Sequence, residues 1–317
     1  MKEKKKSEED KSEEIFVPFS GLRKNDKPKK NKGTSRINIP ASHISKYIPD
    51  NLFDFDEVSE DSISVSYKGK VYYIDLDYPC LDLDGLGIKH ISDIEGIDEI
   101  DTLEELNLFN NQIEEMNFEA LEGLEFIGSL NLENNQISKL EVTSNFIVGS
   151  LNLNNNQITE IGTLKSISAM NTLHLENNKI SKMDGLKTLP REAELEGLYL
   201  TNNMIKEISG LEHHDFLVDL FLEHNQISDI QGLDSLTSLM YLYLSYNQIS
   251  EIKGLKALKR LRKLDLSYNQ ITEIKGLSSL NIGELNLSYN KITTSEPLNS
   301  FVQIRKVNLE GNPILKK

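Results

Sequence analysis

Residues 242–255 read LYLSYNQISEIKGL, and this stretch decides the fold. Its first leucines alternate with outward-facing residues, as in a short strand with one buried face. Asn247 follows within three residues, and isoleucines and a Gly-Leu pair come after it. An amide among regularly spaced apolar residues needs a buried partner, because an unsatisfied polar group inside a protein costs about 1 to 3 kcal/mol.

The pattern L-x-L-x-x-N-x-I recurs ten times, with Val307 in place of the first leucine in the last copy, at intervals of 21 to 25 residues and over about three quarters of the chain. Such a period indicates a solenoid, in which each coil buries its apolar residues against the next. The stretch LDLDGLGI at residue 81 keeps the leucines but has Leu86 in place of the asparagine, which indicates a degenerate first repeat. The repeated asparagines are Asn111, Asn135, Asn156, Asn178, Asn203, Asn225, Asn247, Asn269, Asn290 and Asn312.

This pattern resembles the leucine-rich repeat family. The period near 22 residues and the tail of Ile249, Ile252, Gly254 and Leu255 are similar to the subclass that contains the leucine-rich-repeat regulatory subunit of type-1 protein phosphatase. The bacterial internalins have a similar period. The resemblance implies an α/β chain folded as a curved horseshoe, with a parallel β-sheet on the concave face and 3₁₀ or irregular turns and occasional short helices on the convex face.

The longer copies have room for more regular structure on the return path. They hold FEALEGLEF (118–126) and LPREAELEGL (189–198), which have room for a turn or two of α-helix. The asparagines are expected to be structural, since an amide offers one acceptor and two donors to backbone groups of its own and the adjacent coil.

Function is expected on the outward positions of the strands. The first three strands present mainly Asn and Ser there, whereas the fifth to seventh present aromatic residues bordered by acids. Exposed aromatics of this kind are typical of protein-binding hot spots. The alternative is that aromatics favour strands and pair across them whether or not anything binds. The candidate protein-binding residues are His174, Glu176, Tyr199, Asp219, Phe221, Glu223, Tyr241, Tyr243 and Asp265.

Three further tyrosines, Tyr246, Tyr268 and Tyr289, lie one step beyond the strands, at the rim. Their repeat position is consistent with partner contact and equally with stacking between coils.

Charge separates the N-terminal tail from the rest of the chain. Residues 1–36 hold twelve Lys/Arg and seven Asp/Glu, a net charge of +5, and the total of −15 leaves −20 for residues 37–317. An acidic solenoid is expected to bind neither nucleic acid nor an anionic membrane, because phosphate binding depends on Lys and Arg. We expect a protein partner with a basic surface and a solenoid that is a monomer on its own.

The sequence divides into three parts. Residues 1–35 are predicted to be a disordered charged tail, with RKNDKPKKNKG (23–33) as a candidate localisation or docking signal. Residues 36–80 are expected to cap the solenoid, with a β-hairpin in SISVSYKGKVYYIDL (62–76), and residues 81–317 form the solenoid. The final NPILKK resembles the start of the cap that closes the last repeat of the phosphatase regulatory subunit, without the rest of that cap.

An intracellular, cytoplasmic location is expected. The chain has one cysteine, Cys80, and its N-terminus MKEKKKSEEDKSEE is charged where a secretory signal would be apolar. No apolar run approaches the roughly 18 residues that cross a bilayer.

Nothing in the sequence points to catalysis, a cofactor or a metal. It holds neither a phosphate-binding G-x-x-x-x-G-K-S/T loop nor a G-x-S-x-G elbow. The His213-His214-Asp215 and Glu223-His224 groups should lie on different sides of one coil, so they do not form a metal site. The sequence therefore predicts a non-catalytic protein-interaction scaffold, for example a regulatory subunit of a phosphatase. An internalin-like surface adhesin is the alternative, and a GTPase-activating repeat protein is a third, less favoured one.

Overall fold

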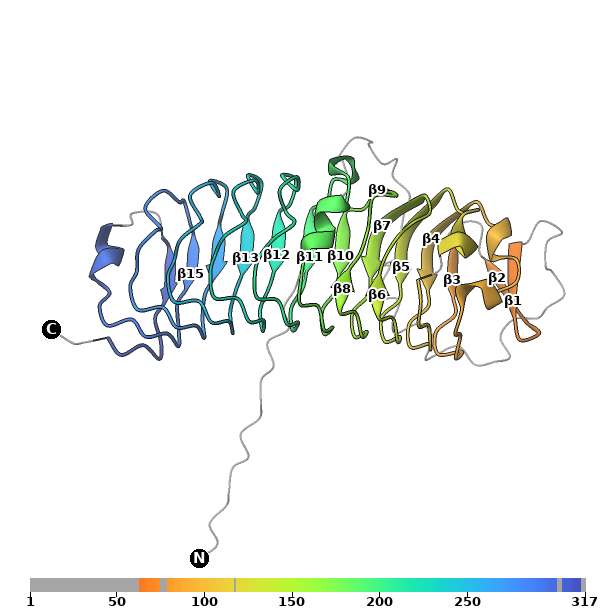
Figure 1. The fold of residues 1–317 in the computed structure, drawn as a ribbon, viewed down its shortest axis with the longest axis horizontal. Coiled ribbons are helices and arrows are strands. Elements are labelled where there is room, and N and C mark those ends of the chain that lie inside the picture. Colours follow the sequence, from red (N-terminus) through yellow and green to blue (C-terminus); the bar gives the residue numbers. More distant parts are fainter. Residues whose placement is uncertain (1–62, 75–78, 117, 301–303, 315–317) are drawn as a thin grey trace, which may run out of the picture. The chain divides into compact units, whose positions relative to one another are not determined.

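A computed structural model describes residues 63–74, 79–116, 118–300 and 304–314, all within the compact unit Val58–Lys317. The predicted charged tail and most of the predicted capping segment lie outside these residues. The unit is a β-solenoid built on one long parallel sheet (Figure 1).

The main sheet runs in chain order from β3 to β16. Its strands are β3 Cys80–Asp82, β4 Thr102–Asn107, β5 Phe126–Asn131, β7 Phe146–Asn152, β10 Thr172–His174, β11 Gly197–Tyr199, β12 Asp219–Phe221, β13 Tyr241–Tyr243, β14 Lys263–Asp265, β15 Glu284–Asn286 and β16 Lys306–Asn308. Strand β9, Ile167–Ala169, pairs with β7, and β6 Lys139–Leu140 pairs with β8 Glu160–Ile161 in a small second sheet.

Leucines of neighbouring coils lie directly opposite one another. Leu220 pairs in register with Leu198 on one side and Leu242 on the other, and the same alignment continues through the sheet. These inward leucines are at most 2% exposed from Leu81 to Leu285. Each buried leucine stabilises the fold by about 1.5 to 3 kcal/mol. The predicted leucine-rich-repeat solenoid is therefore confirmed, and its sheet begins at β3.

Each of the ten asparagines forms hydrogen bonds with backbone groups of two coils. In every case Nδ2 donates to a backbone carbonyl of its own coil and to one of the preceding coil, and Oδ1 accepts from a backbone N–H of the preceding coil. Leu86 replaces the asparagine of the first coil, and the amide of Asn111 bonds to Leu83 O there. The asparagine ladder thus satisfies backbone groups where each strand turns away.

Helical segments are short and of 3₁₀ type throughout the described residues, and none is long and apolar enough to cross a membrane. They are η3 Ile91–Asp93, η4 Ile97–Glu99, η5 Phe118–Leu121, η6 Asp184–Thr188, η7 Arg191–Ala193 and η8 Glu296–Ser300.

The room for α-helical turns at 118–126 and 189–198 is not used, since the 3₁₀ segments η5 and η7 lie there. After η5 the coils approach so closely that a Cβ on Gly123 would lie 2.3 Å from Asp98 O. Segment η7 ends after one turn because Glu194 adopts a left-handed conformation, with φ of 56°.

A β-hairpin covers the N-terminal end of the sheet. Strands β1 Ile63–Tyr67 and β2 Lys70–Ile74 pair antiparallel around Lys68-Gly69, both with positive φ, where the sequence predicts a hairpin. Ser66 and Glu95 exchange two backbone hydrogen bonds of 2.9 Å, and the Tyr67 hydroxyl donates to Gly87 O at 3.2 Å. The hairpin thereby adds its buried side chains to the solenoid core.

The other end of the sheet is more open. Val307 on β16 occupies the position of the first leucine and is 36% exposed, whereas Leu285 on β15 is 2% exposed. Within the described ranges, no element pairs with the outer edge of β16.

Candidate functional site

The sheet face, formed by the outward residues of β10–β14, carries a row of neighbouring rings, of which two pairs are stacked and one is tilted. His174 stacks on Tyr199 with ring centroids 4.3 Å apart and an interplanar angle of 2°. Tyr199 lies 5.0 Å from Phe221, and Phe221 lies 4.4 Å from Tyr243. In-register parallel strands about 4.8 Å apart place equivalent side chains at stacking distance, so one ring per coil gives this sheet-face ladder.

Gly197 makes room for the ladder. A Cβ there would lie 2.9 Å from the Tyr199 ring, so the ring covers the backbone of β11 and leaves Gly197 buried. Strand alternation predicts that Gly197 lies on this face, but it does not predict that the Tyr199 ring covers this glycine. The sequence feature that indicates this contact is a glycine two residues before the tyrosine that lies between the two leucines of the repeat.

Two carboxyl groups beside the ladder are held in a partly desolvated setting. Burial raises the pKa of Glu223, whose carboxylate accepts a hydrogen bond of 2.9 Å from Thr201 Oγ1. Burial, with a smaller contribution from Glu196, also raises the pKa of Asp219. Among the described residues neither group has an ion-pair partner. A cation brought to this face would therefore find two uncompensated carboxylates.

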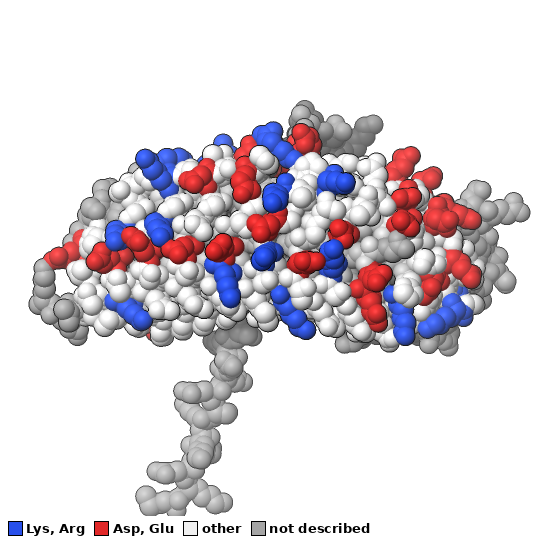
Figure 2. Space-filling view, viewed as in Figure 1, with Lys and Arg blue, Asp and Glu red and all other residues white. Residues whose placement is uncertain are grey.

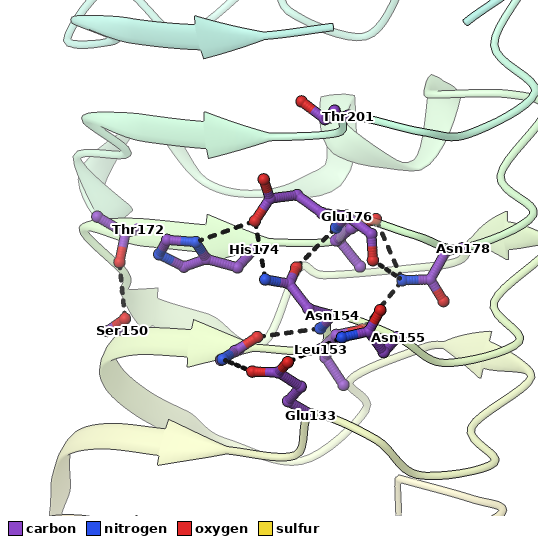
Figure 3. Close-up of polar contacts among 12 residues, drawn as sticks. Glu133, Ser150, Leu153, Asn154, Asn155, Thr172, His174, Glu176, Asn178 and Thr201 are labelled. Carbon is purple, nitrogen blue, oxygen red and sulfur yellow. Dashed lines mark hydrogen bonds and ion pairs between the residues drawn. The ribbon is translucent and has the colours of Figure 1, made fainter. Parts of the chain in front are cut away.

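Glu176 has a different environment (Figure 3). His174 Nδ1 lies 3.9 Å from Glu176 Oε2, and Asn154 Nδ2 donates to the same oxygen at 2.8 Å. The His174 contact, followed by the Asn154 bond, lowers the pKa of Glu176 against the effect of burial. Glu133 continues this network by accepting from Asn155 Nδ2 at 2.8 Å. The face thus passes from hydrogen-bonded amides and acids on β5–β10 to aromatic rings on β11–β13.

The C-terminal end of the ladder is already occupied by a cation. Lys263 Nζ lies 5.1 Å from the ring centroid of Tyr243 and 3.8 Å from Glu284 Oε2. Asp265, expected as an acidic border residue, instead accepts from the backbone N–H of Ser267 at 2.9 Å and from Asn286 Nδ2 at 2.9 Å. The Asp265 carboxylate therefore stabilises the turn at the end of β14. Lys263 was not among the candidate residues, and its place opposite Tyr241 in the register was the signal available.

Tyr241 lies outside the ladder. It is 37% exposed on β13, between Asp219 and Lys263 in the register, and none of the stacked ring pairs includes it. The structure thus groups His174, Tyr199, Phe221 and Tyr243, and leaves Tyr241 as a separate exposed aromatic on the same face.

A second row, the rim ladder, follows the strands in four successive coils. Its members are His224, Tyr246, Tyr268 and Tyr289, with ring centroids 4.1 to 4.3 Å apart. All four have φ between 52° and 54°, a left-handed conformation that Asn adopts at the same position in five earlier coils. Stacking therefore offsets an unfavourable backbone conformation in these coils.

The histidine and acid groups of the loops are used separately. His214 is buried with Nε2 3.1 Å from Leu186 O, and Asp215 pairs with Arg191 at 2.7 Å. His224 stacks on Tyr246. The described residues contain no group of three His, Cys, Asp or Glu side chains that could hold a metal ion.

Protein-family models match three stretches of this solenoid. The model of two consecutive leucine-rich repeats matches residues 150–188 and 237–279, and the single leucine-rich repeat model matches 102–124. The unit is a leucine-rich-repeat solenoid. No curated protein sequence matches the chain.

Several solved leucine-rich-repeat structures are similar. Internalin F of Listeria monocytogenes is 28% identical, with a TM-score of 0.54 over 72% of this chain and 66% of that one. The functional domain of InlJ from the same species has a TM-score of 0.54 at 21% identity, over 75% and 55%. A chain of the Drosophila Toll–Spatzle complex has a TM-score of 0.56 at 18% identity, over 74% and 38%. The last two share the fold alone, and this chain spans less than two thirds of each protein.

Proposed function

We propose that this leucine-rich-repeat solenoid is a non-catalytic scaffold that binds a folded protein partner through its sheet face. The observation that carries the proposal is the ladder of His174, Tyr199, Phe221 and Tyr243 on neighbouring strands. Aromatic side chains held by a sheet lose little conformational freedom on binding and are enriched in interface hot spots. Proteins of this fold, including a chain of the Toll–Spatzle complex, assemble with other proteins.

The partner is expected to present a basic surface. Asp219 and Glu223 have a pKa raised by burial, and the described residues supply no cation to either. Two lysines or arginines of the partner, one for each carboxylate, would compensate these charges, and the −20 of residues 37–317 would steer the partner to the solenoid. Lys263 above Tyr243 is an internal example of a cation on these rings.

The resemblance to the phosphatase regulatory subunit suggests a specific form of this function. The partner would then be a phosphatase catalytic subunit, and the solenoid would act inside the cell as a monomer. Purified type-1 phosphatase catalytic subunit should bind the immobilised chain, and binding should weaken as salt concentration rises. Failure to bind would remove the phosphatase assignment and leave the sheet-face proposal standing.

The sheet face is tested by comparing two triple variants. The first, Tyr199→Ala, Phe221→Ala and Tyr243→Ala, removes the sheet-face ladder. The matched control, Tyr246→Asn, Tyr268→Asn and Tyr289→Asn, removes as many rings from the rim and introduces the residue that earlier coils carry there. Proteins captured from cells of the source organism and quantified by mass spectrometry should be lost with the first variant and retained with the second. Recovery of the same proteins with both would contradict the proposal.

A surface adhesin of internalin type is the second candidate. The 28% identity to internalin F favours it. Surface biotinylation of intact cells distinguishes the two, because a surface adhesin is labelled and an intracellular scaffold is not.

A further inference from the structure

Arginine is scarce in this solenoid and unevenly placed. Residues 63–317 contain four arginines, namely Arg191, Arg260, Arg262 and Arg305. Arg191 makes a two-pronged ion pair with Asp215, at 2.8 and 2.7 Å. The other three lie in the segments that lead into β14 and β16, at the edge of the sheet where strands begin.

Two of these arginines occupy the same position in alternate coils. Gly283 N donates to Arg262 O at 2.8 Å, and Arg305 N donates to Gly283 O at 2.9 Å. Arg262, Gly283 and Arg305 therefore form one row, and two strand spacings separate the arginine backbones by about 10 Å. A Cβ on Gly283 would meet only Arg262 O within 4 Å, at 3.5 Å, so the position between the arginines is open. Arg260 precedes Arg262 by two residues.

Four lysines of the described residues and Arg191 have an acidic neighbour, whereas these three arginines do not. Lys253 lies 2.6 Å from Asp229 and Lys275 lies 3.1 Å from Glu251. Arg260, Arg262 and Arg305 are exposed, and the described part of the chain offers none of them an ion pair. Figure 2 shows Lys and Arg side chains along the upper margin at the end that carries β13–β15.

We propose that Arg260, Arg262 and Arg305, the arginine edge, bind an acidic segment of a protein partner. A guanidinium group binds a carboxylate through two parallel hydrogen bonds, and this edge places three unpaired guanidinium groups on a body of −20. The spacing of about 10 Å fits an extended segment with carboxylates three residues apart, since a polyproline II helix repeats every three residues, or about 9.3 Å.

Nucleic acid fits the same edge less well. The row extends over two strand spacings, and a phosphate backbone that continued beyond it would meet the acidic body. The arginine edge uses different residues and different strands from the sheet-face ladder, so it stands independently of the proposed function.

The test measures fluorescence anisotropy of a labelled Glu-Pro-Pro repeat peptide titrated with the full chain. The double variant Arg262→Gln and Arg305→Gln should weaken binding by about fivefold to tenfold, as expected for two charge-assisted pairs near a surface. The control Lys253→Gln and Lys275→Gln removes the same charge from paired lysines and should change affinity less than about twofold. The variant Arg262→Lys and Arg305→Lys keeps the charge and should still lose part of the affinity.

Circular dichroism of each variant verifies that the solenoid is folded. The proposal is overturned if the acidic peptide does not bind, if the Gln variants of both pairs weaken binding equally, or if a single-stranded DNA of matched charge binds more tightly than the peptide. A Gln-Pro-Pro peptide that bound as well as the Glu-Pro-Pro peptide would also contradict it, because recognition would then not depend on carboxylates.

Discussion

Asn247 Nδ2 lies 2.9 Å from the carbonyl oxygen of Leu222 in the preceding coil, and Asn247 Oδ1 accepts from Ile227 N at 2.9 Å. The same amide donates to Leu244 O of its own coil at 3.2 Å. One side chain thereby satisfies backbone groups of two coils in a buried position. Cohesion between coils is consequently polar as well as apolar.

Asn247→Ala should lower the free energy of unfolding by about 1 to 3 kcal/mol, because buried backbone groups lose their partner. Asn312→Ala at the open end should cost less, since Asn312 and its partners are partly exposed and water can replace the amide. Urea denaturation of both variants measures the difference. A midpoint for Asn247→Ala equal to that of the wild type would contradict the structural role.

Gly254→Ala should destabilise the solenoid more strongly than Gly69→Ala. Both glycines have positive φ, 70° and 76°, so alanine is unfavourable at each. A Cβ on Gly254 would also lie 2.3 Å from Ile230 O, whereas nothing lies within 4 Å of one on Gly69. We expect about 1 kcal/mol for Gly69→Ala and several for Gly254→Ala. Equal losses in thermal denaturation would show that the coils can move apart at Gly254.

The regular parts of this fold were predictable because they repeat. The positions of Leu242, Asn247 and Ile249 recur in ten copies, with Val307 in place of the leucine in the last, and one physical argument about burial and backbone satisfaction covers them all. The sheet-face aromatics followed from strand alternation for the same reason. The sequence does not determine how particular side chains and backbone groups of neighbouring coils contact one another.

Three differences illustrate this limit. Asp265 has the residue type of a border acid, but Ser267 and Asn286 hold its carboxylate. The Tyr199 ring covers Gly197 because of the rotamer that the tyrosine adopts, and a single sequence does not reveal that rotamer. The return segments at 118–126 and 189–198 have enough residues for α-helix, yet they form 3₁₀ turns, because the coils approach closely at Gly123 after η5 and Glu194 ends η7 in a left-handed conformation.

His214 should make stability depend on pH. Burial lowers the pKa of its imidazole below the ordinary value of about 6.5, so below pH 6.5 the unfolded chain binds a proton that the folded chain does not. Stability should therefore fall as the pH decreases from about 6.5 towards the folded-state pKa. His214→Leu should reduce this slope in urea denaturation between pH 5 and 7.5, while His213→Gln at the exposed neighbour should retain it. An unchanged slope in His214→Leu would locate the pH dependence elsewhere.

Tyr268→Asn should leave stability within about 1 kcal/mol of the wild type. The variant loses stacking on Tyr246 and Tyr289, about 0.5 to 1.5 kcal/mol per pair, and gains a residue suited to φ of 53°. Tyr268→Val loses the same stacking and keeps an unfavourable backbone, so it should be clearly less stable than Tyr268→Asn. Equal stability of the two variants in thermal denaturation would mean that backbone conformation contributes nothing at the rim.

Tyr199 should ionise later than an ordinary tyrosine. Burial, followed by the charges of Asp219 and Glu176, raises the pKa of its phenol from 10 to about 12. Between these values the unfolded chain releases a proton that the folded chain retains, so this group's contribution to stability is lost as the pH rises from about 10 to 12. Absorbance titration of the wild type and Tyr199→Phe should differ by one phenol that titrates near pH 12. A difference centred near pH 10 would mean that the Tyr199 ring is not covered as the sheet-face ladder requires. Partner binding buries the ring further, so it should move the titration of Tyr199 to still higher pH.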